Sequence, residues 1–232
     1  YYTTSEPKEN PVHMMNNTFN YSHNRHLLVN MGLDFNIAKD LVLTVNGSYN
    51  TRNYRNDYFV NKGLNNWSDA ENSGAIEHQD VMRWSNEDYL TYSPSFFDGK
   101  WKTNFVLGAS WYYYTWQRAR AAGRNIPNEN FQWHNLGTGT TLEGGQSDYD
   151  KQTMNSFYFR TNHTVLGRYM FGLTLRADGA SMLGANNKYG FFPSASLAWN
   201  IAEEPFFENA KDVVDAFKLR ASYGTVGNAA IG

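Results

Sequence analysis

A row of ring-bearing side chains in the middle of the chain is the set best suited to bind a ligand. Residues 111–116 read WYYYTW, so Tyr112, Tyr114 and Trp116 occupy alternate positions. Alternate residues of an extended strand project from one face, and flat rings there can stack on sugar rings or peptide side chains. Arg118, Arg120 and Arg124 follow in the predicted loop and can meet polar ligands or a partner protein, although most loop charges are solvated. Tyr112, Tyr114, Trp116 and Arg118 are therefore candidates for a substrate-binding surface. The other interpretation, a set of interfacial anchors and loop packing, is favoured.

A second set of side chains is charged. Arg176 and Asp178 occupy alternate positions of one predicted strand, and Arg220 lies on the polar side of another. One interpretation is a charged site that faces water inside a barrel. The other is a structural network in which the charges satisfy one another, and it is favoured because an unpaired buried charge is costly.

The remaining candidates for chemistry do not form a catalytic or metal site. The six histidines lack zinc-ligand spacing such as HExxH, and neither a G-x-S-x-G turn nor a phosphate-binding loop occurs. Asp148 and Asp150 can contact a cation, but a solvated glycine-rich loop is the favoured interpretation. Glu203 and Glu204 are expected to have a structural role, such as capping a short helix before Pro205. We predict no enzyme activity, no catalytic residue, no metal and no cofactor.

The elements that position these residues are strands with a two-residue alternation. Residues 25–37 give the cleanest example, with Leu33 on one face and Asp34 on the other. Further strands are predicted from residue 41, around 82–95, from 101 past 111, around 154–165, from 169, and in 190–199 and 218–224. Short turns are expected at 38–40, 97–100 and 166–168, a short helix within 202–216, and long polar loops over about 52–80 and 120–151. The chain therefore reads as about eight antiparallel strands in four hairpins.

The two faces of these strands predict their surroundings. One face is apolar and the other small, polar or charged, which is typical of a wall between lipid and water. The outward set comprises Leu27, Val29, Met31, Leu33, Phe35, Leu41, Leu43, Val45, Phe105, Leu107, Phe171, Leu173, Leu197 and Leu219. The inward set comprises Asn30, Asp34, Asn46, Asn104, Arg176, Ser196 and Arg220. A one-residue slip would exchange the two sets.

The fold class predicted is all-β, a transmembrane antiparallel β-barrel of the bacterial outer membrane. No run of about 18 apolar residues is present, which excludes a helical membrane protein. A soluble carbohydrate-binding β-sandwich is the alternative fold, but sandwich strands usually span only about 5–6 residues. A formal net charge of -2 gives no basic surface for nucleic acid. Because Tyr1 is not preceded by Met and Gly232 ends a turn-like stretch, we expect residues 1–232 to be a segment of a longer chain.

Several phrases resemble the SusC/RagA family of TonB-dependent outer-membrane transporters, in the order that the family has them. They are LDFNI (33–37), NEDYLTY (86–92), LGASW (107–111), LRADGAS (175–181), KYGFFPS (188–194), Trp199 with EEPF (203–206), and KLRASYGTVG (218–227). Each phrase alone is weak evidence. The ordered set covers nearly the whole chain.

This resemblance implies a 22-stranded barrel, of which residues 1–232 supply about eight strands, without the plug, the TonB box or the carboxyl-terminal strand. It also implies active import of a glycan or peptide nutrient, a SusD-like surface lipoprotein as lid, and TonB as the periplasmic partner. The rivals are a passive porin or surface adhesin barrel without TonB coupling and, among transporters, a siderophore or cobalamin receptor.

Overall fold

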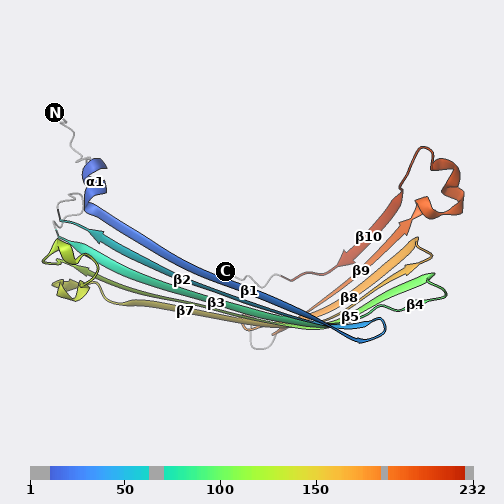
Figure 1. Ribbon diagram of the computed structural model, residues 1–232, viewed down its shortest axis with the longest axis horizontal. Helices are drawn as coiled ribbons and strands as arrows, with labels where there is room; N and C mark the ends of the chain where they lie inside the picture. The colour runs from blue at the N-terminus through green and yellow to red at the C-terminus, as the bar shows by residue number, and fades with distance from the viewer. Residues whose placement is uncertain (1–10, 63–70, 184–187, 228–232) are drawn as a thin grey trace. The chain divides into compact units, whose positions relative to one another are not determined.

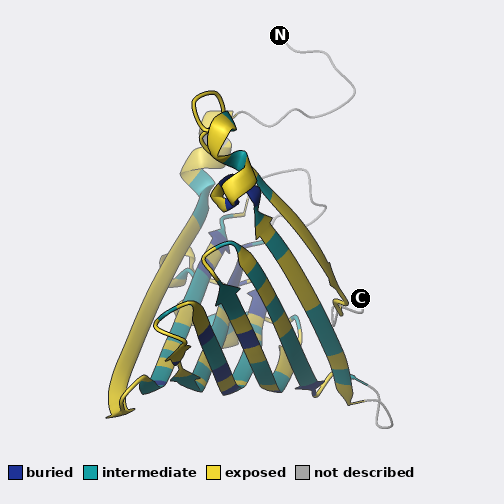
Figure 2. Cartoon of the chain, turned by 90° about the vertical axis from the view of Figure 1, so that its right-hand side faces the viewer, coloured by how far each residue is buried: buried dark blue, intermediate teal, exposed yellow. Residues whose placement is uncertain are grey.

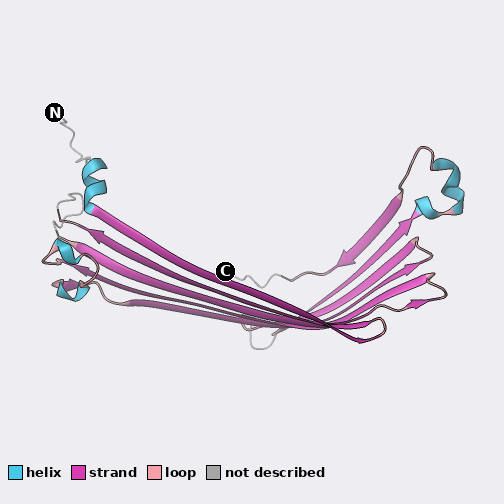
Figure 3. Ribbon diagram, in the orientation of Figure 1, coloured by secondary structure: helices cyan, strands magenta, loops and turns pink. Residues whose placement is uncertain are grey.

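The computed structural model describes residues 11–62, 71–183 and 188–227, and strands dominate it (Figure 3). The long strands are β1 (Thr18–Ala38), β2 (Leu41–Val60), β3 (Ser73–Tyr92), β5 (Trp101–Arg124), β7 (Gln146–Val165), β8 (Tyr169–Ala180), β9 (Tyr189–Asn200) and β10 (Lys218–Gly224). They form one antiparallel sheet in chain order (Figure 1). The two-residue strands β4 (Ser95–Phe96) and β6 (Thr141–Leu142) both pair with β5. The predicted meander of about eight strands is confirmed.

Helices are few and short. They are α1 (Pro11–Asn17) and the 3-10 turns η1 (Glu129–Phe131), η2 (Leu136–Thr138), η3 (Ile201–Glu203) and η4 (Pro205–Ala210). The helical connection expected before β10 is thus present as η3 and η4. Within the described part of the chain, no helix has the length and apolar character needed to cross a membrane.

Tight turns close the hairpins at the predicted positions. Leu166 and Gly167 both have positive φ, 53° and 73°, and Val165 lies opposite Tyr169, so three residues form the tight turn. The Arg168 amide donates to the Val165 carbonyl at 3.1 Å and completes this turn. Asp98 and Gly99 also have positive φ, so the Asp-Gly pair forms the hairpin before β5. These turns are fixed by local chemistry.

The long polar loops were predicted too long. Residues 52–60 continue β2 and residues 73–80 belong to β3, so the described sheet covers most of the stretch assigned to a loop. Likewise β5 extends to Arg124, and β7 begins at Gln146, before Asp148 and Asp150. The cause is that polar side chains occupy both faces there, while the backbone ladder continues.

The chain divides into two compact units that share these strands. The first unit comprises Tyr1–Leu28, Asn50–Met82 and Thr115–Lys151. Its core is a small cluster of Phe59, Ile126 and Trp133, against which Phe19, Ile76 and Leu136 pack. The segment with η1 and η2 therefore packs on one face of the strands in this unit.

The second unit comprises Val29–Tyr49, Arg83–Tyr114 and Gln152–Gly232. Residues directly opposite in an antiparallel pair project from the same face. Phe171 lies opposite Leu197, which lies opposite Ala221, and Trp199 lies opposite Leu219. Ser196 lies opposite Gly172 and Ser222 on the other side of the sheet. We call these sides the apolar face and the polar face.

The apolar face is exposed and aromatic. Phe105 stacks with Phe159 at 6.4 Å, and the His163 ring stacks on Phe171 at 4.4 Å. The chain exposes 54% of Leu33 and 65% of Leu197. Bands of differing exposure alternate along the strands in Figure 2. For the strands whose register links them, the predicted grouping of outward and inward residues is confirmed.

Candidate functional site

The polar face of the second unit carries a network of charged groups. Arg176 Nε donates to both carboxylate oxygens of Asp178, at 2.6 and 2.9 Å, and its Nη2 donates to Ser156 Oγ at 3.0 Å. The Arg176 guanidinium also lies over the Tyr158 ring, 5.7 Å from its centroid. The Tyr158 hydroxyl in turn donates to Glu87 Oε1 at 2.8 Å. Arg176, Asp178 and Glu87 therefore each have a polar partner on the polar face.

A glycine makes room for this network. Gly108 occupies a polar-face position of β5, the strand between β3 and β7. A Cβ atom at this position would lie only 2.5 Å from Tyr158 Oη, so a larger residue would collide with the tyrosine. The Tyr158 ring can therefore cross β5 and reach Glu87 on β3. Sequence reasoning missed Tyr158 and Glu87. The signal was a lone glycine at an inward position beside a long polar side chain, but it does not say which strand supplies that side chain.

Arg220 does not join the Arg176–Asp178 pair. It lies opposite Ala198 on β9, and Ala198 lies opposite Met170 of β8, whereas Arg176 lies opposite Phe192. Arg220 therefore lies at the level of Met170, six residues nearer the short turn than Arg176, and the two arginines are at different heights on the polar face. The two-residue alternation of a strand predicts the face from which a side chain projects. It does not predict which residue of the neighbouring strand lies beside it.

Two rings of the predicted binding surface lie in the second unit. Tyr112 and Tyr114 occupy alternate, half-buried positions of β5. The Arg83 guanidinium lies 5.1 Å from the centroid of the Tyr114 ring, a cation–π contact. Tyr113, between them, stacks with Trp84 at 5.8 Å on the apolar face. Tyr112 and Tyr114 therefore project from the polar face, as the alternation predicts.

Trp116 and Arg118 continue the same alternate series on β5 in the first unit. Arg118 Nη2 donates to Glu77 Oε2 at 2.6 Å, and its Nη1 lies 3.7 Å from Asp148 Oδ2. Arg118 of β5 thus pairs with two carboxylates, Glu77 on β3 and Asp148 on β7. Trp116 is half-buried.

The first unit also has a pocket on its polar face. It measures about 500 Å³ and is lined by Tyr58, Arg120 and Arg124 from long strands, with Glu71 and Glu143 beside them. Arg124 Nε bonds with Glu143. This pocket offers both charge signs to a polar ligand.

The acidic candidates have structural partners. Asp148 pairs with Arg118, and no cluster of metal-ligating side chains occurs in the ranges described. Glu204 stands before η4 but makes no side-chain capping bond, so the predicted cap is wrong. Its carboxylate instead accepts from the Tyr169 hydroxyl at 2.5 Å, Trp199 Nε1 at 2.9 Å and Arg168 Nη1 at 2.5 Å. Glu204 therefore fastens the η3–η4 connection to the start of β8 and the end of β9.

These features define a class of protein. The antiparallel meander has an exposed apolar face rich in aromatic residues, a polar face with satisfied charges, and short turns that close its hairpins. That combination is the wall of a transmembrane β-barrel, with lipid on the apolar face and water on the polar face.

The family model described as TonB dependent receptor-like, beta-barrel matches residues 2–231. The chain belongs to this family, and family members are β-barrel proteins of the outer membrane. TonB-dependent receptor P3 of Formosa agariphila is 33% identical over 156 residues, which cover 67% of this chain and 15% of that protein. TonB-dependent receptor SusC of Bacteroides thetaiotaomicron is 39% identical over 82 residues, covering 35% of this chain and 8% of that protein.

Solved structures share the fold. The RagAB peptide transporter matches with a TM-score of 0.88 over 100% of this chain and 26% of that chain, at 18% identity. This chain spans between 8% and 23% of the length of the curated relatives that it matches. The resemblance to SusC/RagA transporters, the barrel fold and the outer-membrane location are thereby confirmed.

Proposed function

We propose that this chain forms part of the barrel wall of a SusC-like transporter that imports a glycan or a peptide across the outer membrane. The observation that carries the proposal is the polar face of β5, where Tyr112, Tyr114 and Trp116 follow one another at alternate positions. Ring faces at such a wall suit both sugar rings and peptide side chains. The similarity to SusC and to the RagAB peptide transporter supports the same class of cargo.

The proposal includes two protein partners. A SusD-like surface lipoprotein would close the barrel from outside, and TonB would supply the energy from the periplasm. The charged pocket with Arg120 and Glu143 lies at the long-loop end of the strands and suits a polar contact with cargo or lid. Binding and gating, with no bond chemistry, are the functions proposed for these side chains.

The test replaces Tyr114 and Trp116 by Ala in the complete receptor. We expect uptake of a labelled oligosaccharide mixture or of a defined peptide mixture to fall, while the barrel stays folded, because lumen-facing positions tolerate change. Phe at both positions keeps the rings and is the matched control. Unchanged uptake and unchanged copurification of the lid with the Ala variant would contradict the assignment of these rings.

Energy coupling is tested separately. A protonophore should abolish uptake by a TonB-coupled importer. Uptake that persists after the proton gradient has collapsed would indicate a passive porin.

A further inference from the structure

The first unit has a second pocket, on the side of the sheet opposite the polar face. We call it the outer pocket. It measures about 480 Å³ and is lined among others by Tyr21, His23, Arg25, Arg55, Trp133 and His134. Strands β1 and β2 supply its floor, and the segment between β5 and β6 supplies Trp133 and His134. The Tyr21 and Trp133 rings lie 5.3 Å apart, so this segment packs directly on β1.

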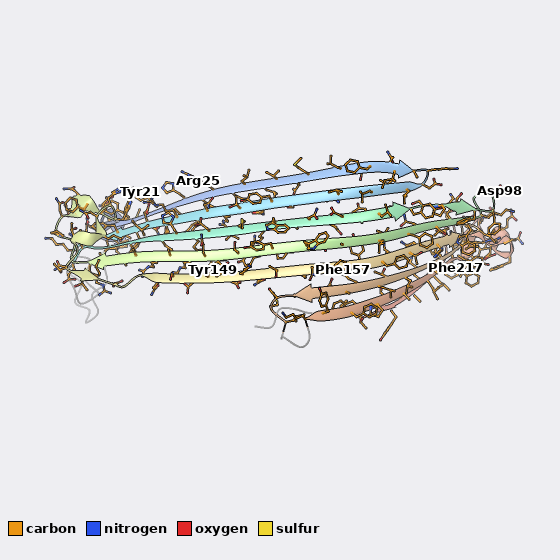
Figure 4. All side chains as sticks on the ribbon, turned by 90° about the horizontal axis from the view of Figure 1, so that it is seen from below. Tyr21, Arg25, Asp98, Tyr149, Phe157 and Phe217 are labelled. Carbon is orange, nitrogen blue, oxygen red and sulfur yellow. The ribbon has the colours of Figure 1, made fainter. Side chains whose placement is uncertain are left out.

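The outer pocket lies on the side of β1 from which Leu27 projects. Along β1, Arg25, His23 and Tyr21 occupy the alternate positions that precede Leu27, Val29 and the exposed apolar residues up to Ile37. The alternate residues between them project from the other side of β1, where His26 forms a hydrogen bond with Asn50 of β2. Figure 4 labels Tyr21 and Arg25 near the same end of β1. The side that presents aliphatic residues to lipid thus changes to cationic and aromatic residues at Arg25.

This change lies at the level of the lipid headgroups if Leu27 is the outermost lipid-facing residue of β1. Strand residues rise about 3.3 Å each, so Arg25 lies roughly 7 Å and His23 roughly 13 Å beyond Leu27 along the strand. The headgroup layer adds about 5–8 Å on each side of a hydrocarbon core of about 30 Å. Because barrel strands are tilted, both residues fall within or just beyond that layer.

The chemistry of the outer pocket suits an anion. No carboxylate among the described residues pairs with Arg25. Arg55 pairs with Asp57 through its Nε, at 2.8 Å. Both terminal nitrogens of the Arg55 guanidinium can therefore still donate hydrogen bonds to an anion. His23, His78 and His134 add imidazole nitrogens. Of the acids on this face, Asp57 is bound by Arg55, and Asp80 accepts from Asn53 and Gln117.

We propose that the outer pocket binds the phosphate-bearing headgroup of a lipid in the outer leaflet. Guanidinium groups form charge-assisted, often bidentate hydrogen bonds with phosphate, and basic side chains at membrane surfaces recognise anionic headgroups. Trp133 and Tyr21 supply the rings that favour the membrane interface. This inference rests on the orientation of the barrel wall and not on the cargo or on TonB.

The experiment uses the complete receptor in nanodiscs that contain bisphosphorylated lipid A, and native mass spectrometry of the released protein counts retained lipid. We expect Arg25→Gln to lower retention about tenfold, the effect of one lost charged hydrogen bond. His134→Gln tests the pocket from the loop side and should also lower retention. Arg52→Gln is the matched control, because Arg52 lies on the opposite face and bonds with Asn24; its retention should equal that of the unmodified receptor.

Two further arms identify the source of the phosphate. Dephosphorylated lipid A with the same acyl chains should be retained at about the level of Arg25→Gln, and millimolar inorganic phosphate should not displace bisphosphorylated lipid A. Equal retention of both lipids, or equal retention by the Arg25→Gln and Arg52→Gln variants, overturns the proposal. Displacement by inorganic phosphate overturns it in favour of a free-anion site. Uptake assays report separately on the proposed function.

Discussion

Individual polar side chains in this wall are held by partners on neighbouring strands. The Thr44 hydroxyl donates to Asp34 Oδ1 at 2.5 Å, and Tyr158 bridges Glu87 and Arg176. Even His163, on the apolar face, has contacts to both ring nitrogens, from Thr103 at 3.0 Å and Thr161 at 2.8 Å. A polar group near the hydrocarbon core costs several kcal/mol when it is unpaired. Such pairing is therefore a condition for keeping these residues in the wall.

The two faces should respond oppositely to charge. Leu33→Arg should destabilise the folded receptor by about 2–4 kcal/mol if Leu33 lies near the bilayer midplane, because its side chain meets lipid. Asp34→Asn should cost far less, since an amide oxygen can still accept from Thr44. Denaturant unfolding of the complete receptor in lipid vesicles measures both. A larger loss from Asp34→Asn than from Leu33→Arg would mean that the faces are exchanged.

Gly108 should be required for the position of Tyr158. In Gly108→Ala the new methyl overlaps the end of the Tyr158 ring, and we expect the ring to move and the Tyr158–Glu87 hydrogen bond to break. Tyr158→Phe removes that bond without adding volume. A double-mutant cycle should therefore show that Gly108→Ala costs less in the Tyr158→Phe background. Strict additivity of the two changes in unfolding free energy would refute this coupling.

At the scale of strands and turns, the sequence predicts the strand segments whose lipid-facing side must be apolar, and it misses the strand segments that lie beyond the lipid. Between Leu27 and Ile37 one face must be apolar, so the alternation is visible and the strand is readable. Beyond that band both faces contain polar residues, as in the Arg55–Asp57 pair, and the period-two signal disappears. The backbone ladder nevertheless continues, and residues 52–60 were consequently predicted as a loop.

The candidate site shows the same division. The alternation placed Tyr112 and Tyr114 on one side of β5 without a structure. It could not reveal that Arg83 covers Tyr114, or that Arg118 is bound to Glu77, because these contacts depend on the register between β3 and β5. Register is fixed by the whole set of pairings and turns, and no local pattern encodes it.

The η3–η4 connection should depend on the charge of Glu204. Hydrogen bonds from Tyr169 and Trp199, with Arg168 nearby, hold the pKa of the Glu204 carboxyl below its ordinary value. Its contribution to stability is therefore complete above the ordinary carboxyl pKa and is lost as the pH falls through the lowered pKa of the folded state. Thermal unfolding of the complete receptor between pH 7 and pH 3 should show this loss.

The matched pair of variants for that experiment is Glu204→Gln and Glu203→Gln. Glu204→Gln should lower the melting temperature at neutral pH and reduce its acid dependence. Glu203 is exposed and only its carbonyl oxygen is near Arg168, at 3.5 Å, so Glu203→Gln should behave like the unmodified receptor. Equal acid profiles for all three proteins would exclude Glu204 as the group responsible.

At the scale of the whole chain, the sheet has two ends. β1 and β10 are the terminal strands of the order, each hydrogen-bonded on one side only within the described residues. β1 is exposed along its length from Asn20 to Ala38. In lipid, each unpaired backbone group costs several kcal/mol, and in water an open edge recruits other strands. The remaining wall of a larger barrel would satisfy both edges.

Residues 1–232 expressed alone should therefore aggregate instead of inserting into detergent or lipid as a monomer. The open β1 and β10 edges and the exposed apolar face act together, since Leu33, Leu197 and their neighbours then have neither lipid nor protein to cover them. Gel migration before and after heating, with size-exclusion chromatography in detergent, measures this outcome, and the complete receptor refolded in the same detergent is the control. A monomeric, heat-modifiable product would show that β1 and β10 can pair with each other. The chain would then close a small barrel by itself, and the proposal that it is one part of a wider importer wall would be wrong.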